Sequence, residues 1–125
     1  MVRAGARILI VDDEPDVRET LGEYLTSEGY KVIFAESALG ALSCVREYHP
    51  DVVLLDLSMP GVVTGDAIIG AISKTTPVIV ITAAIDRDVT DRALRDGAVD
   101  YIAKPFQLGR VGKVVKTVLA KPGRA

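Results

Sequence analysis

Carboxylate side chains stand at the ends of two strongly apolar segments of this 125-residue chain. Residues 52–55 (Val-Val-Leu-Leu) lead directly into Asp56, and residues 7–11 lead into Asp12 and Asp13. Runs of β-branched and leucine residues are typical of strands buried on both faces, and an acid at the end of such a strand is costly unless a nearby group needs its charge. Asp56 is therefore the first candidate for a group that binds a cation or attacks an electrophile.

Five strand-like segments alternate with five helix-like segments, and these elements must position the acids. The predicted strands are residues 7–11, residues 30–35, the run that ends at Asp56, residues 78–81 and residues 99–103. The first predicted helix runs from Pro15 to a stop at Gly29, and the second runs from residue 38 to just before His49. The other three predicted helices cover residues 66–73, residues 88–95, and the segment from Leu108 through Val118. This alternation predicts an α/β domain with a parallel sheet covered by helices on both faces. In the helix over 88–95, Val89 and Leu94 are expected to face the core.

All strands of a parallel sheet end at one edge, and open α/β sheets place their sites there. In this sequence the first predicted strand is followed by Asp12 and Asp13, the third ends in Asp56, the fourth in Thr82 and the fifth at Lys104. The order of the elements therefore predicts three carboxylates, one hydroxyl and one ammonium group in a single crevice.

Three carboxylates in one crevice repel one another unless a cation neutralises them. Mg²⁺ suits such a site, because it binds one or two carboxylates together with waters and phosphate oxygens. Lys104 supplies a compact positive charge for a phosphate oxygen, and Thr82 with the backbone N–H that follows it could donate to a second oxygen. Asp56 is then the group that attacks phosphorus and becomes an aspartyl phosphate.

With these residues in this order, the chain resembles the receiver domain of two-component response regulators over about residues 7–120. The resemblance implies a flavodoxin-like (βα)5 doubly wound parallel sheet with strand order 2-1-3-4-5. It also implies one receiver domain over residues 1–125, in which 121–125 is a tail or the start of a linker. Such a domain catalyses only its own phosphorylation and dephosphorylation, so it is not expected to be an enzyme for an external substrate.

The resemblance assigns the phosphoacceptor and the metal ligands. Asp56 would accept the phosphoryl group. Asp13, Asp56 and the backbone carbonyl of Ser58 would bind Mg²⁺ directly, and Asp12 would act through a water molecule. The chain departs from the family after Met59-Pro60, where the acid follows the glycine and the loop is one residue longer. This departure affects partner contacts and loop motion and leaves the predicted ligands in place.

The resemblance also assigns the groups that hold and sense the phosphoryl group. Thr82, the backbone N–H of Ala83 and Lys104 would bind the phosphoryl oxygens. Thr82 and Tyr101 would form a switch in which the aromatic ring turns inward when the threonine hydroxyl moves to the phosphate. A half-buried aromatic on an edge strand is the structural alternative for Tyr101. The peptide bond between Lys104 and Pro105 is expected to be cis.

The implied partners are a sensor histidine kinase or histidine phosphotransfer protein, and an output domain or effector protein. Phosphorylation would switch the surface formed by the fourth helix, the fifth strand and the fifth helix, through which a homodimer could also form. Direct nucleic-acid binding is not expected, because 15 basic side chains are balanced by 17 acidic ones. No apolar run approaches a membrane span, and the single cysteine, Cys44, excludes an internal disulfide. A cytoplasmic location is therefore expected.

Three other functions are compatible with the same order of elements. A Mg²⁺-dependent phosphatase of the haloacid-dehalogenase type would use Asp56 as its nucleophile, but such enzymes usually carry a second acid two residues later, where this chain has Ser58. A flavodoxin-like cofactor protein would follow its first strand with hydroxyls and glycine, whereas residues 12–16 read Asp-Asp-Glu-Pro-Asp and repel a cofactor phosphate. A pseudo-receiver that works by protein contact alone would not need the complete set of groups.

Overall fold

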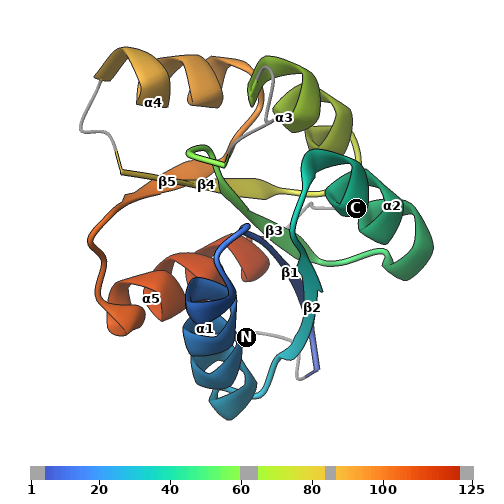
Figure 1. Ribbon diagram of the computed structural model, residues 1–125, viewed down its shortest axis with the longest axis vertical. Coiled ribbons are helices and arrows are strands. Elements are labelled where there is room, and N and C mark those ends of the chain that lie inside the picture. The colour runs from blue at the N-terminus through green and yellow to red at the C-terminus, as the bar shows by residue number, and fades with distance from the viewer. Residues whose placement is uncertain (1–4, 60–64, 84–86, 122–125) are drawn as a thin grey trace.

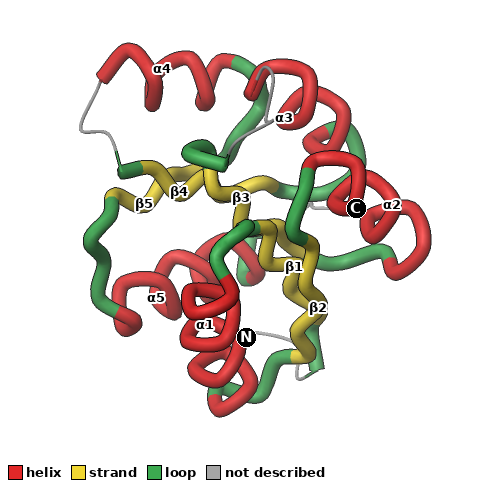
Figure 2. The backbone as a smooth tube through the Cα atoms, viewed as in Figure 1, coloured by secondary structure: helices red, strands yellow, loops and turns green. Residues whose placement is uncertain are grey.

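A computed structural model describes residues 5–59, 65–83 and 87–121 (Figures 1 and 2). In chain order the elements are β1 (Arg7–Val11), α1 (Pro15–Ser27), β2 (Lys31–Ala35), α2 (Ala38–Tyr48), β3 (Val52–Asp56), α3 (Gly65–Ser73), β4 (Val78–Thr82), α4 (Arg87–Arg95), β5 (Asp100–Ala103) and α5 (Leu108–Leu119). The strands pair in parallel in the order β2-β1-β3-β4-β5. The predicted α/β fold and its strand order are confirmed.

The sheet separates two apolar cores. Helices α1 and α5 cover one face, and α2, α3 and α4 cover the other (Figure 1). Because successive side chains of a strand point to opposite faces, β1 contributes Ile8 and Ile10 to the core under α1 and α5 and Leu9 and Val11 to the other core. The central strands β3 and β4 are buried along their whole length. Burial on both sides fixes β3 in place, and Asp56 at its end lies in the middle of the sheet edge.

Helix boundaries follow the local signals in the sequence. Pro15 occupies the start of α1, and the hydroxyl of Ser37 accepts a hydrogen bond of 3.0 Å from the backbone N–H of Gly40 at the start of α2. Gly29 and Gly97 end α1 and α4 with φ angles of 97° and 123°, a conformation that other residues rarely adopt. None of the helices in the described ranges has the length and apolarity needed to cross a membrane.

Helix α4 buries a different face from the predicted one. Thr90 and Ala93 are its buried residues, whereas Leu94 is 40% exposed. The predicted inward position of Leu94 is therefore wrong. Residues five apart, such as Val89 and Leu94, lie about 140° apart around a helix, so both cannot point at the sheet. The strand that follows also begins one residue later than predicted, at Asp100.

Candidate functional site

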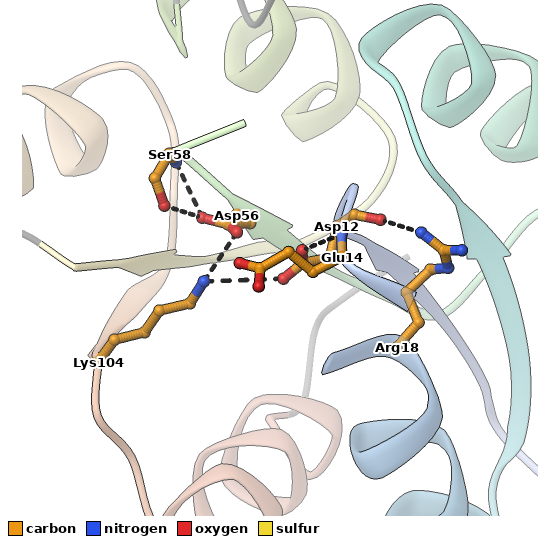
Figure 3. Close-up of polar contacts among 6 residues, drawn as sticks. All are labelled: Asp12, Glu14, Arg18, Asp56, Ser58 and Lys104. Atoms are coloured by element: carbon orange, nitrogen blue, oxygen red, sulfur yellow. Dashed lines mark hydrogen bonds and ion pairs between the residues drawn. The ribbon is translucent and has the colours of Figure 1, made fainter. Parts of the chain in front are cut away.

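The ends of β1, β3 and β5 bring two carboxylates and one ammonium group together (Figure 3). Asp12 directly follows β1, Asp56 is the last residue of β3, and Lys104 directly follows β5. The two acids are 1% and 2% exposed, respectively. Nζ of Lys104 donates to Oδ2 of Asp56 at 2.9 Å and lies 3.8 Å from Oδ2 of Asp12. The predicted meeting of these three side chains is confirmed, and their chemical roles stay predictions.

Backbone hydrogen bonds just beyond the regular ladder hold the ends of β1 and β5 in register with their neighbouring strands. The N–H of Asp12 donates to the carbonyl of Ala35 at 3.1 Å, which joins the end of β1 to β2. The N–H of Lys104 donates to the carbonyl of Thr82 at 2.8 Å, which joins the end of β5 to β4. Asp12 and Lys104 are thus carried by backbone whose position the sheet determines, and little reorganisation is needed to bring their side chains together.

Asp56 is a buried carboxylate that is kept ionised. Its Oδ1 accepts two hydrogen bonds from Ser58, one from the backbone N–H at 2.8 Å and one from the hydroxyl at 2.6 Å. Burial alone would raise the pKa of Asp56, but hydrogen bonds from the Ser58 hydroxyl and from Lys104 outweigh burial and bring that pKa below its usual value. The hydrogen bonds from Ser58 to Asp56 were not predicted; only the backbone carbonyl of Ser58 was expected to act, as a Mg²⁺ ligand. The available signal was Asp56 itself, because an aspartate side chain often accepts a hydrogen bond from the backbone N–H two residues later, in an Asx turn. Here that residue is Ser58.

Asp12 holds a proton more tightly than Asp56 does. Burial raises the pKa of Asp12 to about 6, and the neighbouring Asp56 adds to this rise. A hydrogen bond of 2.9 Å from the backbone N–H of Glu14 to Oδ1 of Asp12 opposes it in part. For Lys104, burial would lower the pKa, but Asp56 and Asp12 raise it above its usual value. Near neutral pH the three side chains therefore carry two negative charges and one positive charge.

Four acidic residues at this edge have the spacing of a cation site. One carboxylate oxygen from each of Asp12, Asp13, Glu14 and Asp56 lies within 4.8 Å of the others. Oδ2 of Asp12 is buried and has no hydrogen-bond partner in the described part of the chain. A hard divalent cation can satisfy such oxygens, so the donor set fits Mg²⁺. Glu14 was not among the predicted ligands, and the signal for it was its place directly after the two aspartates.

Thr82 and Ala83 lie next to the end of β3. Asp56 pairs with Ile81 in the register of β3 and β4, so Thr82 extends one residue beyond this pair. Thr82 is buried and Ala83 is exposed. The fold thus brings both residues to the edge where Asp56 lies, and their part in binding phosphoryl oxygens stays a prediction.

The remaining predicted features lie at the margin of this edge. Tyr101 is 40% exposed on the edge strand β5, which is compatible with both the switch and the structural alternative. The peptide bond between Lys104 and Pro105 is cis, as the resemblance implied. The unusual loop after Met59 falls on residues 60–64, which lie outside the described residues.

Solved structures and curated sequences resemble this chain along most of its length. A receiver domain protein described as CheY-like, from Methanospirillum hungatei, superposes with a TM-score of 0.85 at 26% identity and covers 93% of this chain and 94% of its own. NtrX from Brucella abortus superposes with a TM-score of 0.84 at 33% identity, over 92% of this chain and 27% of its own. The architecture is therefore shared with proteins of different lengths.

Two curated relatives differ in how much of their length the chain spans. Transcriptional regulatory protein KdpE of Mycobacterium tuberculosis is 43% identical over 101 residues, which are 79% of this chain but 44% of that protein. Sporulation initiation phosphotransferase F of Bacillus subtilis is 36% identical over 116 residues, which are 90% of this chain and 93% of that protein. The sequence model described as the response regulator receiver domain matches residues 8–116. The chain belongs to the receiver domain family of two-component response regulators.

Proposed function

We propose that Asp56 accepts a phosphoryl group from a phosphohistidine donor and that the resulting aspartyl phosphate switches the surface of α4, β5 and α5. The observation that carries this proposal is the state of Asp56. Its carboxylate is 2% exposed, yet Ser58 and Lys104 keep it ionised beside three further acids. A buried, ionised carboxylate at the edge of a parallel sheet is suited to attack phosphorus.

In the proposed step, a carboxylate oxygen of Asp56 forms a new bond to phosphorus. The bond between phosphorus and the imidazole nitrogen of the donor breaks, and its electron pair returns to the imidazole. Lys104, whose Nζ lies 2.9 Å from Oδ2 of Asp56, would attract an oxygen of the incoming group. Thr82 and the N–H of Ala83 would donate to the other oxygens. Positioning and charge neutralisation account for most catalysis of phosphoryl transfer.

Asp13, Asp56 and the Ser58 carbonyl would hold Mg²⁺ directly, with Asp12 acting through a water. When bound, the cation supplies positive charge to the acids and to the phosphoryl oxygens. The proximity of the four carboxylates supports this assignment, as does Oδ2 of Asp12, which has no hydrogen-bond partner among the described residues. Glu14 adds negative charge to the same cluster and would strengthen cation binding.

The proposed partners are a histidine kinase or phosphotransfer protein as donor, and an output domain or effector as receiver of the signal. The names of the two relatives, a transcriptional regulatory protein and a sporulation phosphotransferase, support a place in such a relay. Thr82 and Tyr101 would transmit the change to the α4-β5-α5 surface, where Leu94, Val99 and Tyr101 are exposed. A homodimer through that surface is part of the same proposal.

The phosphatase alternative is not favoured by the geometry of Ser58. Two residues after the nucleophile, such an enzyme needs a general acid, whereas the Ser58 hydroxyl donates a hydrogen bond to Asp56 itself. Multiple turnover of a phosphorylated small molecule would support the alternative.

Mass spectrometry of the intact protein tests the proposal. With acetyl phosphate and Mg²⁺, the wild-type chain is expected to gain the mass of one phosphoryl group, and it should gain none when EDTA is added. Asp56→Asn should remain unlabelled, whereas Asp91→Asn, which removes an exposed acid of α4, should behave as wild type. Mg²⁺-dependent labelling of Asp56→Asn would refute Asp56 as the acceptor. Size-exclusion runs on both wild-type samples test the dimer.

A further inference from the structure

Arg18 contacts the acidic loop of residues 12–14 from a side that Lys104 does not occupy. Nη1 of Arg18, on α1, donates to the backbone carbonyl of Asp12 at 2.7 Å. Figure 3 shows that Arg18 and Lys104 approach Asp12 from different sides, Arg18 at the carbonyl and Lys104 at the carboxylate. The distance is typical of a strong hydrogen bond from a charged donor. The side chain of Arg18 is only 18% exposed, which reduces competition from water.

This contact determines the direction of the peptide group that precedes Asp13. The carbonyl of Asp12 and the N–H of Asp13 belong to one planar unit, so a donor that fixes the oxygen also fixes the start of Asp13. The preceding peptide group is fixed as well, because the N–H of Asp12 donates to Ala35 of β2. Asp13 itself is exposed. Because little side-chain packing surrounds an exposed residue, the direction of the Asp13 carboxylate depends on the backbone that carries it.

We propose that Arg18 is a positioning residue for the cation site: by holding the Asp12 carbonyl, it sets the direction from which the Asp13 carboxylate reaches Mg²⁺. This inference rests on the proposed function, since it assumes that Asp13 is a ligand. Arg18 does not touch the cation or the phosphoryl group. Residues that orient metal ligands typically change metal affinity by about 10- to 100-fold when they are removed.

Arginine suits this position because its planar fork can serve two acceptors. Nη1 bonds to Asp12, and Nη2 lies 3.6 Å from a carboxylate oxygen of Glu36, which follows β2. The side chain of Glu36 is 77% exposed, so this ion pair contributes little by itself. The bond to the Asp12 carbonyl is the contact on which the inference depends.

A purely electrostatic role and a positioning role of Arg18 predict opposite changes in Mg²⁺ affinity when Arg18 is replaced. Loss of a positive charge near four acids would by itself strengthen Mg²⁺ binding. Loss of the carbonyl anchor would let the peptide group before Asp13 rotate and would weaken binding. The direction of the change in Mg²⁺ affinity therefore separates a positioning role from a purely electrostatic one.

Calorimetric titration of the full chain with Mg²⁺ tests the inference. Arg18→Met is expected to weaken binding by about tenfold. Arg18→Lys keeps the charge but lacks the fork, and it should weaken binding by about threefold. Glu36→Gln should stay within about twofold of wild type, because exposed ion pairs contribute little. Lys116→Met removes one positive charge from an exposed site on α5 and controls for net charge.

Unfolding by urea in EDTA is measured on the same variants. A structural brace without a positioning role would lower the free energy of unfolding of Arg18→Met and leave its Mg²⁺ affinity unchanged. Unchanged or tighter binding by Arg18→Met overturns the inference. If Arg18→Met does not fold, Arg18→Lys alone tests the positioning role. A Mg²⁺ affinity of Arg18→Lys within about twofold of wild type would then overturn that role. The proposed site fails separately if wild-type protein binds no Mg²⁺ or if Asp13→Asn binds it equally well.

Discussion

Lys104 and Asp56 are 48 residues apart in the chain, and their side chains form a hydrogen-bonded ion pair of 2.9 Å at the edge of the sheet. The side chain of Asp56 is 2% exposed and that of Lys104 is 19% exposed. Removing charges from water is costly, so a pair in such surroundings is weak evidence of a stabilising role. Its position beside Asp12 and the other acids instead supports the proposed chemical role, in which the ammonium would neutralise charge until a phosphoryl group arrives.

Lys104→Met is expected to change cation binding and phosphorylation in opposite directions. Removal of the ammonium leaves the acids with more negative charge, so Mg²⁺ should bind a few times more tightly. The incoming phosphoryl oxygen loses its positive partner, so the rate of labelling by acetyl phosphate should fall at least about tenfold. Lys113→Met, at an exposed position of α5, provides the matched loss of charge. A labelling rate equal to wild type would remove Lys104 from the proposed mechanism.

The metal-free protein should lose stability as Asp12 ionises. Its pKa is raised from 3.8 to about 6, so the folded state binds this proton more tightly than the unfolded chain does. The contribution of Asp12 to the free energy of unfolding is thus fully present below pH 3.8 and is lost as pH rises through about 6. Urea unfolding in EDTA between about pH 4 and pH 7 measures this loss.

Asp12→Asn should lack that loss and should be more stable than wild type near neutral pH by roughly 1–3 kcal/mol. Asp91→Asn, at an exposed position of α4, should follow the wild-type profile instead. Parallel profiles for wild type and Asp12→Asn would show that Asp12 does not hold its proton in the fold.

Two glycines of α5 should respond oppositely to alanine. A Cβ at Gly112 would lie 2.5 Å from Oη of Tyr24 on α1, whereas a Cβ at Gly109 would meet nothing within 4 Å. Gly109→Ala should raise the free energy of unfolding by about 0.5–1 kcal/mol, because alanine favours the helix. Gly112→Ala should lower it by about 1–2 kcal/mol through overpacking between α1 and α5. Equal effects in urea titrations would mean that α1 and α5 are not closely packed at Gly112.

Tyr101 should become less accessible to solvent when the protein is phosphorylated. The chain has four tyrosines and no tryptophan, so tyrosine emission can be followed directly. Acrylamide quenching is compared between wild type and Tyr101→Leu, and the difference reports on Tyr101 alone. If Tyr101 turns inward, acrylamide should quench the emission of Tyr101 less strongly after treatment with acetyl phosphate and Mg²⁺. The difference in quenching between wild type and Tyr101→Leu should therefore become smaller. Quenching that does not change would support the alternative of a static, half-buried aromatic.

The sequence alone determined the α/β class of the fold and the residues at the carboxyl edge of its sheet. Apolar runs such as 52–55 and the alternation with amphipathic segments specify a parallel sheet with covered faces. In such a sheet all strand ends share one edge, and the strand order that the resemblance implies puts Asp12 and Asp56 on neighbouring strands; the structure brings both within reach of Lys104. These predictions succeed because they depend on periodicity and connectivity, which a sequence displays directly.

Only the tertiary structure decided the contacts of the side chains around that edge. The donation from Ser58 to Asp56, the inclusion of Glu14 in the acidic cluster and the anchor from Arg18 to the Asp12 carbonyl depend on turn geometry and rotamers. The exposure of Leu94 depends on how α4 is rotated against the sheet. Hydrogen bonds form or fail over a few tenths of an ångström, and spacing along a chain does not fix positions to that accuracy.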